Sequence, residues 1–326
     1  MTRKSALARP VVMVVALLAA QLAHAQTVEP KDPERKAERE VLQRAGAEPS
    51  ALSVELSAGV ESDSNVSVNE LDANTGEGDL ATVVDVDLDY ELALDADSDL
   101  RLGYGFSGTD HDDFVAYDLQ SHLATATIDH DFGTVDATAA YRFIHARLGG
   151  HDYLSMQQVS PSIARFFGKK LFVRAEYTYS DKDFADIDLR DATVDAGGAD
   201  LYCFLKGVRR YVVIGYRYRR EDANDAQYDY DANDLKLRLT QRFRVLDRDA
   251  ILKLGWLYEQ RDYSARTPAI GQQRDDDRMR FDATLEIPIG EHFFTVLGYE
   301  HGGFSSNLPS ADYEENVASI KVGLKY

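Results

Sequence analysis

The sequence predicts an all-β protein, a transmembrane antiparallel β-barrel of about 14 strands with a short N-terminal helical or linker segment. Three observations indicate this fold class. Segments of alternating apolar and polar residues recur from residue 51 to the end of the chain, short and long connectors separate them in turn, and many apolar rows end in an aromatic residue. Bacterial outer-membrane barrels show all three features, and their strand number is even.

The segment DLKLRLTQRF, residues 234–243, shows the alternation clearly. Leu235, Leu237 and Leu239 alternate with Lys236 and Arg238. Successive side chains of a strand point to opposite faces of the sheet, so one face of this strand is apolar and the other is cationic. In a secreted sandwich the charged face would be the outer surface, whereas in a barrel it lines the lumen and the apolar face contacts lipid. Strand length and connector pattern together favour the barrel.

About 14 such segments follow one another, and many have roughly 10 to 15 residues. A globular strand usually has 5 or 6 residues, whereas a tilted membrane strand with a protruding end needs the greater length. The predicted strands begin near Leu52, Leu80, Asp99, Tyr117, Thr134, Asp152, Lys170, Asp191, Arg210, Tyr228, Asp249, Asp277, His292 and Glu315.

The connectors are of two kinds, and the two kinds alternate. The short connectors are residues 95–98, 131–133, 168–169, 206–207, 246–248 and 288–290. The longer, more acidic connectors are residues 61–79, 107–115, 180–190, 221–227, 264–276 and 301–311; the short connector 148–151 is the exception in that series. Short periplasmic turns and longer external loops give this alternation.

The apolar rows predict the lipid-facing surface. Aromatic residues at the ends of an apolar band are typical of the two membrane–water boundaries. The clearest rows are Leu100, Leu102, Tyr104 and Phe106; Leu171, Val173, Ala175, Tyr177 and Tyr179; Leu252, Leu254, Trp256 and Tyr258; and Met279, Phe281, Ala283, Leu285 and Ile287.

The first 50 residues precede the barrel. Arg3, Lys4 and Arg9 lead into an apolar run at residues 11–22, and Ala23-His24-Ala25 fits a small-x-small cleavage site. This pattern predicts a secretory signal peptide at residues 1–25. Residues 26–50 are polar and are expected to form a periplasmic linker or short helix, which leaves residues 51–326 for the barrel.

Composition excludes several classes of function. The net charge of −20 disfavours nucleic-acid binding, which needs a basic surface, so no nucleic acid is expected as a partner. The single Cys203 excludes an intrachain disulfide and a zinc site with several thiolates. The acidic loops lack the residue order of a calcium-binding loop, and no motif of a catalytic site is present. We therefore expect no cofactor, no metal and no enzymatic activity.

The polar faces of the strands predict a charged lumen. One alternative is a transverse field between acidic and basic rows, which would orient dipolar solutes; the other is pairing of the charges across neighbouring strands. The acidic residues predicted to line the lumen are Glu55, Asp85, Asp87, Asp89 and Glu91. The basic ones are Arg101, Arg142, Arg174, Arg217, Lys236, Arg238, Arg242, Lys253, Arg278, Arg280 and Lys321, and Arg219 and Lys325 share their faces.

The last strand carries the expected signal for membrane assembly. Gly323 and Tyr326 lie where outer-membrane barrels carry the terminal signal for the barrel assembly machinery, although the signal usually continues for two more residues. An unpaired edge would leave polar backbone groups in hydrocarbon. We therefore expect the last strand to pair with the first, around residues 52–60, which brings Lys321 and Lys325 towards Glu55 and Asp85.

A resemblance extends over residues 51–326. Its motifs are Asp63-Ser64-Asn65-Val66, Gly215-Tyr216-Arg217-Tyr218, Asp222-Ala223-Asn224-Asp225, Tyr228-Asp229-Tyr230-Asp231, Arg261-Asp262-Tyr263 and Ser306-Asn307. In this order they resemble the carboxy-terminal barrel of the surface lipoprotein assembly modifier family and related repeat-associated barrels. The resemblance implies movement of lipoproteins or secreted polymers across the outer membrane. Family members usually carry helical repeats before the barrel, and residues 26–50 are too few for one 34-residue repeat.

Two functions remain open from the sequence. The first is a pore or translocation conduit with a charged lumen in the outer membrane of a Gram-negative bacterium, with surface lipoprotein or polymer export as the use that the resemblance implies. The second is a surface structural or binding barrel that its own side chains and loops plug. Outer-membrane lipid and the barrel assembly machinery are expected partners in both, and a periplasmic partner or an exported lipoprotein in the first.

Overall fold

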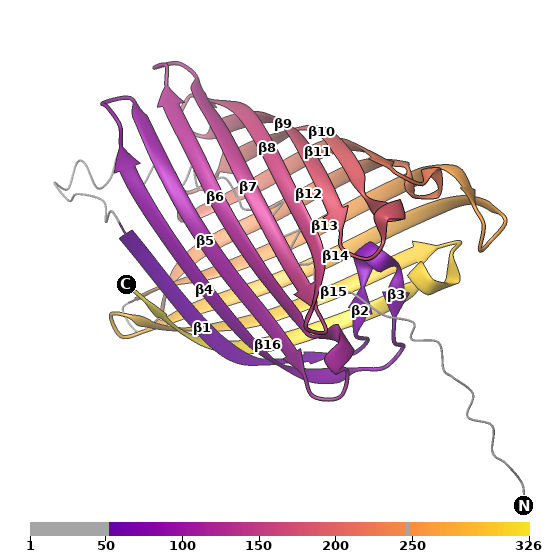
Figure 1. The fold of residues 1–326 in the computed structure, drawn as a ribbon. Coiled ribbons are helices and arrows are strands. Elements are labelled where there is room, and N and C mark those ends of the chain that lie inside the picture. The colour runs from indigo at the N-terminus through magenta and orange to yellow at the C-terminus, as the bar shows by residue number, and fades with distance from the viewer. Residues whose placement is uncertain (1–51, 246–247) are drawn as a thin grey trace, which may run out of the picture.

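The computed structural model describes residues 52–245 and 248–326 and shows a closed antiparallel barrel of fourteen strands (Figure 1). The predicted fold class is confirmed. Residues 1–51, with the predicted signal peptide and linker, and residues 246–247 lie outside the described residues. The barrel strands are β1 (Leu52–Asp63), β4 (Asp79–Ala93), β5 (Ser98–His111), β6 (Leu119–Asp131), β7 (Asp136–Leu148), β8 (His151–Phe167), β9 (Leu171–Phe184), β10 (Ala192–Phe204), β11 (Arg210–Ala223), β12 (Tyr230–Val245), β13 (Arg248–Thr267), β14 (Gln272–Ile289), β15 (Phe293–Ser306) and β16 (Tyr313–Lys325).

Strand starts agree with the alternation in the sequence. Thirteen of the fourteen strands begin within two residues of the predicted position. The exception is β14, which begins at Gln272 and not at Asp277. The acidic run 275–277 was assigned to a loop, but it continues the strand and pairs with β13 and β15.

The long connectors are shorter than predicted, because strand pairing continues beyond the apolar band. The connector predicted at residues 264–276 consists only of residues 268–271, between strands of 20 and 18 residues. Gly149 and Gly150 link β7 to β8 with φ of 52° and 80°, the two positive values that a tight two-residue hairpin turn requires. Five short 3₁₀ helices lie in the remaining long connectors: η1 (Asn69–Leu71), η2 (Val115–Tyr117), η3 (Asp188–Arg190), η4 (Ala226–Tyr228) and η5 (Pro309–Ala311).

The first and last strands close the barrel, as the sequence predicts. The backbone N–H of Val54 donates to the Tyr326 carbonyl over 2.9 Å, and that of Tyr326 donates to the Val54 carbonyl over 2.8 Å. Ser57 lies opposite Gly323 in the register. The pairing satisfies backbone groups that would otherwise face hydrocarbon. Both described chain ends, Leu52 and Tyr326, therefore lie at the end of the barrel that carries the short turns (Figure 1).

The outer surface carries the apolar rows. Leu102, Ile163, Leu237 and Ile320 are among the large apolar side chains exposed there. Towards the long loops, tyrosine hydroxyls of alternate strands form hydrogen bonds with side chains of the following strand. Examples are Tyr104 with His122, Tyr141 with Gln157, Tyr177 with Asp195, Tyr216 with Asn233, Tyr218 with Asp231, Tyr258 with Asp277 and Tyr299 with Asn316. An apolar ring and a satisfied hydroxyl suit the membrane–water boundary.

Aromatic residues also gather near the short turns, where Phe132, Phe167, Phe293 and Tyr326 are exposed. The apolar band between the two aromatic levels is the part of the barrel that contacts lipid. No helix among the described residues has the length and apolar content to cross a bilayer.

Residues 64–78 fold away from the barrel wall. They contain the short strands β2 (Ser67–Val68) and β3 (Ala73–Asn74), which pair with each other and flank η1. We call residues 64–78 the mouth loop. Figure 1 shows this hairpin beside the loop ends of β14, β15 and β16, in the mouth at the opposite end of the barrel from Leu52 and Tyr326.

Candidate functional site

The side chains predicted to line the lumen lie on the strand faces opposite the lipid-facing rows. Lys236, for example, lies between Leu235 and Leu237, whose side chains are 42% and 45% exposed on the outer surface. The acidic residues lie on β1 (Glu55) and β4 (Asp85, Asp87, Asp89, Glu91). The basic residues lie on β5 (Arg101), β7 (Arg142), β9 (Arg174), β11 (Arg217), β12 (Lys236, Arg238, Arg242), β13 (Lys253), β14 (Arg278, Arg280) and β16 (Lys321).

Ion pairs join many of these charges. Lys321 lies 2.7 Å from Asp85, and Lys325 lies 3.0 Å from Glu55, across the closure of the barrel. Other pairs within the lumen are Arg101 with Asp129, Arg174 and Arg217 with Glu176, Lys236 with Asp200, and Arg280 with Glu300. Arg142 donates a hydrogen bond to Gln158 over 2.9 Å. Local pairing of charges, one of the two alternatives from the sequence, is therefore a feature of the lumen.

The charges also differ between the two sides of the lumen. A cavity of about 110 Å³ lies against the inward faces of β9–β14, which we call the basic wall. Its cations are Arg174, Arg217, Arg219, Lys236, Arg261, Arg278 and Arg280, and its carboxylates are Glu70, Glu176, Asp200, Asp234 and Glu259. Cations are thus in excess at this cavity.

A second cavity, of about 480 Å³, lies against the inward faces of β15, β16, β1, β4 and β5, which we call the acidic wall. Its charged lining is Glu55, Glu61, Asp85, Asp87, Glu300 and Lys321, together with Asp282 of the adjoining β14. Carboxylates are in large excess there, so the lumen has two sides of opposite sign although neighbouring charges pair.

The mouth loop crosses the lumen. It begins after β1, and its tip contacts Lys182 on β9, six strands further around a ring of fourteen. On its near side, Ser67 donates to Glu315 over 3.1 Å, and Asn74 donates to the Ser310 carbonyl over 3.0 Å. The loop is therefore held at both ends of a span across the mouth.

Apolar contacts hold one side of the mouth loop. Val66 and Val68 are fully buried, in one cluster with Leu119, Ile144 and Met156. Their neighbours in that cluster come from the inward faces of β6–β9 and from η2. Full burial of a valine side chain stabilises a structure by about 1.5–3 kcal/mol, so these two residues anchor the loop firmly.

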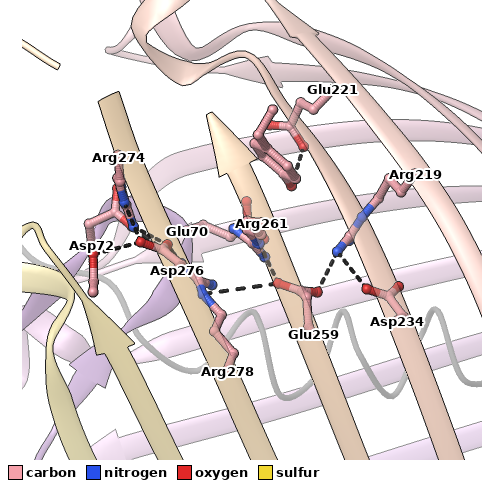
Figure 2. A network of polar contacts seen from close by, with 12 residues as sticks. Glu70, Asp72, Arg219, Glu221, Asp234, Glu259, Arg261, Arg274, Asp276 and Arg278 are labelled. Atoms are coloured by element: carbon pink, nitrogen blue, oxygen red, sulfur yellow. Dashed lines mark hydrogen bonds and ion pairs between the residues drawn. The ribbon is translucent and has the colours of Figure 1, made fainter. Parts of the chain in front are cut away.

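A network of ion pairs holds the tip of the loop (Figure 2). Asp72 lies 2.7 Å from Arg190 and 2.6 Å from Arg274, and Glu70 lies 3.3 Å from Lys182. We define the mouth cluster as six cations and the four wall carboxylates among them. The cations are Lys182, Arg190, Arg219, Arg261, Arg274 and Arg278, and the carboxylates are Glu221, Asp234, Glu259 and Asp276.

Contacts within the mouth cluster run both along single strands and between strands. Arg274 lies 2.6 Å from Asp276, and Arg278 lies 3.1 Å from the same carboxylate. Glu259 contacts Arg219 and Arg261. Buried charges are stable only when each has partners, and these carboxylates supply them.

The loop carboxylates are held in their charged forms. Burial by itself would raise the pKa of Asp72, but Arg190, Arg274 and Arg278 hold the pKa of this carboxyl well below its usual range. Burial opposes ionisation of Glu70 in the same way, and Lys182 with three arginines lowers the pKa of its carboxyl below the usual value. Both side chains therefore act as anions in the mouth.

Sequence reasoning missed most of the mouth cluster. Lys182, Glu221, Arg274 and Asp276 were assigned to loops, although each continues the inward-facing alternation of its strand. Extending that alternation past the apolar band could have found them. Glu70 and Asp72 carry no local signal, because the direction in which a loop folds depends on distant contacts.

At the other end of the lumen, Gly323 and Tyr326 have distinct surroundings. A Cβ atom on Gly323 would lie 2.1 Å from the Phe294 ring, so any other residue here would require this inward aromatic ring to move. Tyr326 is 74% exposed, and its ring stacks on His292 with centroids 4.5 Å apart. The structure thus gives Gly323 a packing role, and the assembly signal at Gly323 and Tyr326 stays a prediction.

Within the described ranges, no group of three or more His, Cys, Asp and Glu side chains is arranged to hold a metal ion. Cys203 is a free thiol on β10.

The closed barrel, its apolar outer band and its charged lumen define an outer-membrane β-barrel of a Gram-negative bacterium. The sequence model of the family "Surface lipoprotein assembly modifier" matches residues 149–326, more than half of the chain. The chain belongs to this family, as its motifs suggested. No curated protein sequence gives a significant match.

Several solved structures of outer-membrane proteins are similar to this chain. The OmpF structure from Salmonella typhi, in complex with daunomycin, aligns with a TM-score of 0.50 at 9% identity and covers 84% of this chain and 97% of that chain. The anion-selective porin from Comamonas acidovorans aligns with a TM-score of 0.48 at 8% identity, covering 84% and 98%. CdiB from Acinetobacter baumannii aligns with a TM-score of 0.48 at 13% identity over 85% of this chain, which spans only 60% of CdiB.

Proposed function

We propose that the protein is a conduit across the outer membrane and that the mouth loop closes it in the conformation described here. The observation that carries this proposal is the lumen itself. Two cavities lie inside the barrel, and charged side chains line both of them. A barrel that serves only as an anchor can fill its interior with apolar side chains, as small barrels do, and has no need of a charged lining.

Family membership supports a more specific use, in the export or assembly of a surface lipoprotein. The proposed partners are that lipoprotein and a periplasmic protein that delivers it. A polypeptide in transit presents both charges and apolar groups. The basic wall, the acidic wall and the apolar cluster at the mouth offer contacts for each. No catalytic grouping is invoked, and we propose that the protein is not an enzyme.

Conductance across planar bilayers tests the conduit. The purified full-length protein should give steady conductance steps in potassium chloride after the mouth loop is released, for example by Glu70→Gln with Asp72→Asn. The wild-type protein should be closed for more of the recording time. A variant that inserts as a folded barrel and never conducts would overturn the proposal.

The second candidate function is a plugged structural or binding barrel. It is favoured by the packing of Val66 and Val68 inside the mouth, because full burial of these side chains stabilises the closed form. The same recordings separate the two functions. Silence of both the wild-type protein and the loop variant, each shown to be inserted, supports the plugged barrel.

A further inference from the structure

We propose that the mouth cluster is a binding site for an acidic peptide segment, and that residues 70–72 of the mouth loop occupy this site when the conduit is closed. The inference rests on the proposed conduit, since the peptide would be a segment of the passenger. It deepens that function by giving the passenger a chemical class and by making the loop a built-in competitor for the same site.

Charge balance is the first argument. The mouth cluster has six cations and four wall carboxylates, so its walls carry a net excess of two positive charges. Glu70 and Asp72 of the loop supply the two missing negative charges. Uncompensated buried charges are strongly unfavourable. When the loop leaves, the site therefore needs two anionic groups from another source.

The contacts to the loop indicate that the preferred ligand is a peptide. Arg190 donates a hydrogen bond to the main-chain carbonyl of Glu70, in addition to its ion pair with Asp72. Leu71, between the two acidic residues, packs against the apolar cluster at the mouth. The site thus accepts an acidic residue, an apolar residue and an acidic residue in sequence. A polysaccharide has the negative charges but lacks the apolar side chain.

The guanidinium groups keep their positions through contacts that do not involve the loop. Arg190 lies over the ring of Tyr228 at 4.2 Å, Arg261 over Tyr230 at 4.7 Å and Arg274 over Tyr263 at 4.5 Å. Arginine over an aromatic ring is stabilised and held flat. The site therefore stays organised after the loop leaves, which favours rebinding of a ligand.

A passenger can reach the site from inside the barrel. Glu70, Arg219, Arg261 and Arg278 also line the 110 Å³ cavity of the basic wall. An acidic segment that moves along this wall meets the cluster at the side where Glu70 is bound. It can then replace the loop residue by residue, so that the energy of binding opens the mouth.

Peptide binding to the full-length protein tests the inference. The probe is a fluorescent nonapeptide with the sequence of residues 66–74, Val-Ser-Val-Asn-Glu-Leu-Asp-Ala-Asn, and the measurement is fluorescence anisotropy in detergent. We expect Glu70→Gln with Asp72→Asn to bind the peptide about tenfold more tightly than the wild-type protein, because the tethered competitor has lost its charges.

The matched control is Glu77→Gln with Asp112→Asn. It removes the same two charges from the same end of the barrel, and both side chains are exposed, outside the mouth cluster. This control should bind the peptide as weakly as the wild-type protein. Equal affinity of the two double variants overturns the inference, since it would mean that net charge alone sets the affinity.

Three further arms complete the test. The peptide with Gln and Asn in place of its two acidic residues should bind at least tenfold more weakly, and equal binding overturns the inference. An oligomer of alginate, an anionic polysaccharide, should also bind more weakly, and equal or tighter binding overturns the preference for peptide. Should the loop variant fail to fold, the peptide is added to a Cys203→Ser protein with Val68→Cys, in which Glu70 and Asp72 are unchanged. The peptide should speed maleimide labelling of the cysteine at position 68, and no increase overturns the inference.

Peptide binding and conductance can succeed or fail independently, so the two experiments test this inference and the proposed conduit separately. A barrel that conducts but does not bind the acidic peptide overturns this inference and leaves the conduit. A barrel that binds the peptide and never conducts supports the site and overturns the conduit.

Discussion

The basic and acidic walls face each other across one lumen, yet their charged side chains differ in solvent exposure and in number of partners. On the basic wall, Arg274 and Asp276 are 3% and 1% exposed, and each has several charged partners. On the acidic wall, the side chains of Asp85 and Lys321 are about a quarter exposed, at 26% and 23%, beside the larger cavity. Water can screen the second pair and not the first.

This difference separates two roles. A buried network is rigid, and the loss of one member leaves the others without compensation. The mouth cluster is therefore suited to hold a specific group, which in this conformation is the tip of the mouth loop. A solvated wall tolerates change and acts through its overall charge. The following predictions test the distinction, beginning with the largest effect.

Neutralising one carboxylate on each wall should have unequal consequences. Asp276→Asn removes one of the two buried carboxylates that Arg274 and Arg278 share, the other being Asp72, and should lower the free energy of unfolding by about 3 kcal/mol. Asp85→Asn, on the solvated wall, should cost about 1 kcal/mol or less. Reversible urea unfolding in phospholipid vesicles measures both. Similar losses for the two variants would show that the walls do not differ as proposed.

The basic wall can also be compared with the lipid face behind it. Leu254 and Lys253 are neighbours on β13 that point to opposite sides. Leu254→Arg should cost about 2–4 kcal/mol if it lies near the bilayer midplane, whereas Lys253→Leu should cost much less. The yield of folded, heat-modifiable barrel reports the difference. Equal loss from both changes would contradict the assignment of the two faces.

Reversing charge on the basic wall should change ion selectivity, and the free-energy change should be smaller than in the two preceding predictions. Arg238→Glu with Arg280→Glu should favour cations by about fivefold, which corresponds to roughly 1 kcal/mol of interaction between charges in water. The reversal potential in a potassium chloride gradient measures this ratio, in the loop-released background. Asp85→Asn should shift it in the opposite direction, and an unchanged potential in both would mean that these side chains do not line the ion path.

The sequence predicted the strands better than the site, for a physical reason. The two-residue period of a strand is a local property, so Leu235, Lys236 and Leu237 could be assigned to their faces without knowledge of the fold. The contact between Asp72 and Arg274 joins residues 202 positions apart. The residues around Asp72 and around Arg274 in the sequence do not indicate that these two side chains form a pair. The pairing of Lys321 with Asp85 was predictable because closure of the barrel fixes which strands are neighbours.

Mild acid should leave the mouth closed, which is the smallest effect expected. Arg190, Arg274 and Arg278 hold the pKa of Asp72 well below its usual range, and Lys182 with neighbouring arginines lowers that of Glu70. A carboxyl whose pKa is lowered on folding contributes stability above its unfolded pKa of about 4, and this stability is lost only as the pH falls through the folded pKa. Between pH 7.5 and pH 5 both groups remain charged, and the loop should stay attached.

Cysteine labelling measures this stability. Two labelling rates are compared in a Cys203→Ser background: that at Val68→Cys, a buried position of the mouth loop, and that at Glu77→Cys, an exposed position. Their ratio cancels the pH dependence of the thiol itself. The ratio should change by less than about twofold between the two pH values. The same measurement with His111→Gln, on the adjoining β5, controls for a histidine effect. A tenfold rise at pH 5 that persists in this control and in Glu315→Gln, which alters the carboxyl group in contact with Ser67, would mean that the loop carboxylates are not held by the arginines as the structure shows. The mouth cluster would then resemble the acidic wall, where solvent and not fixed partners determines the state of each charge.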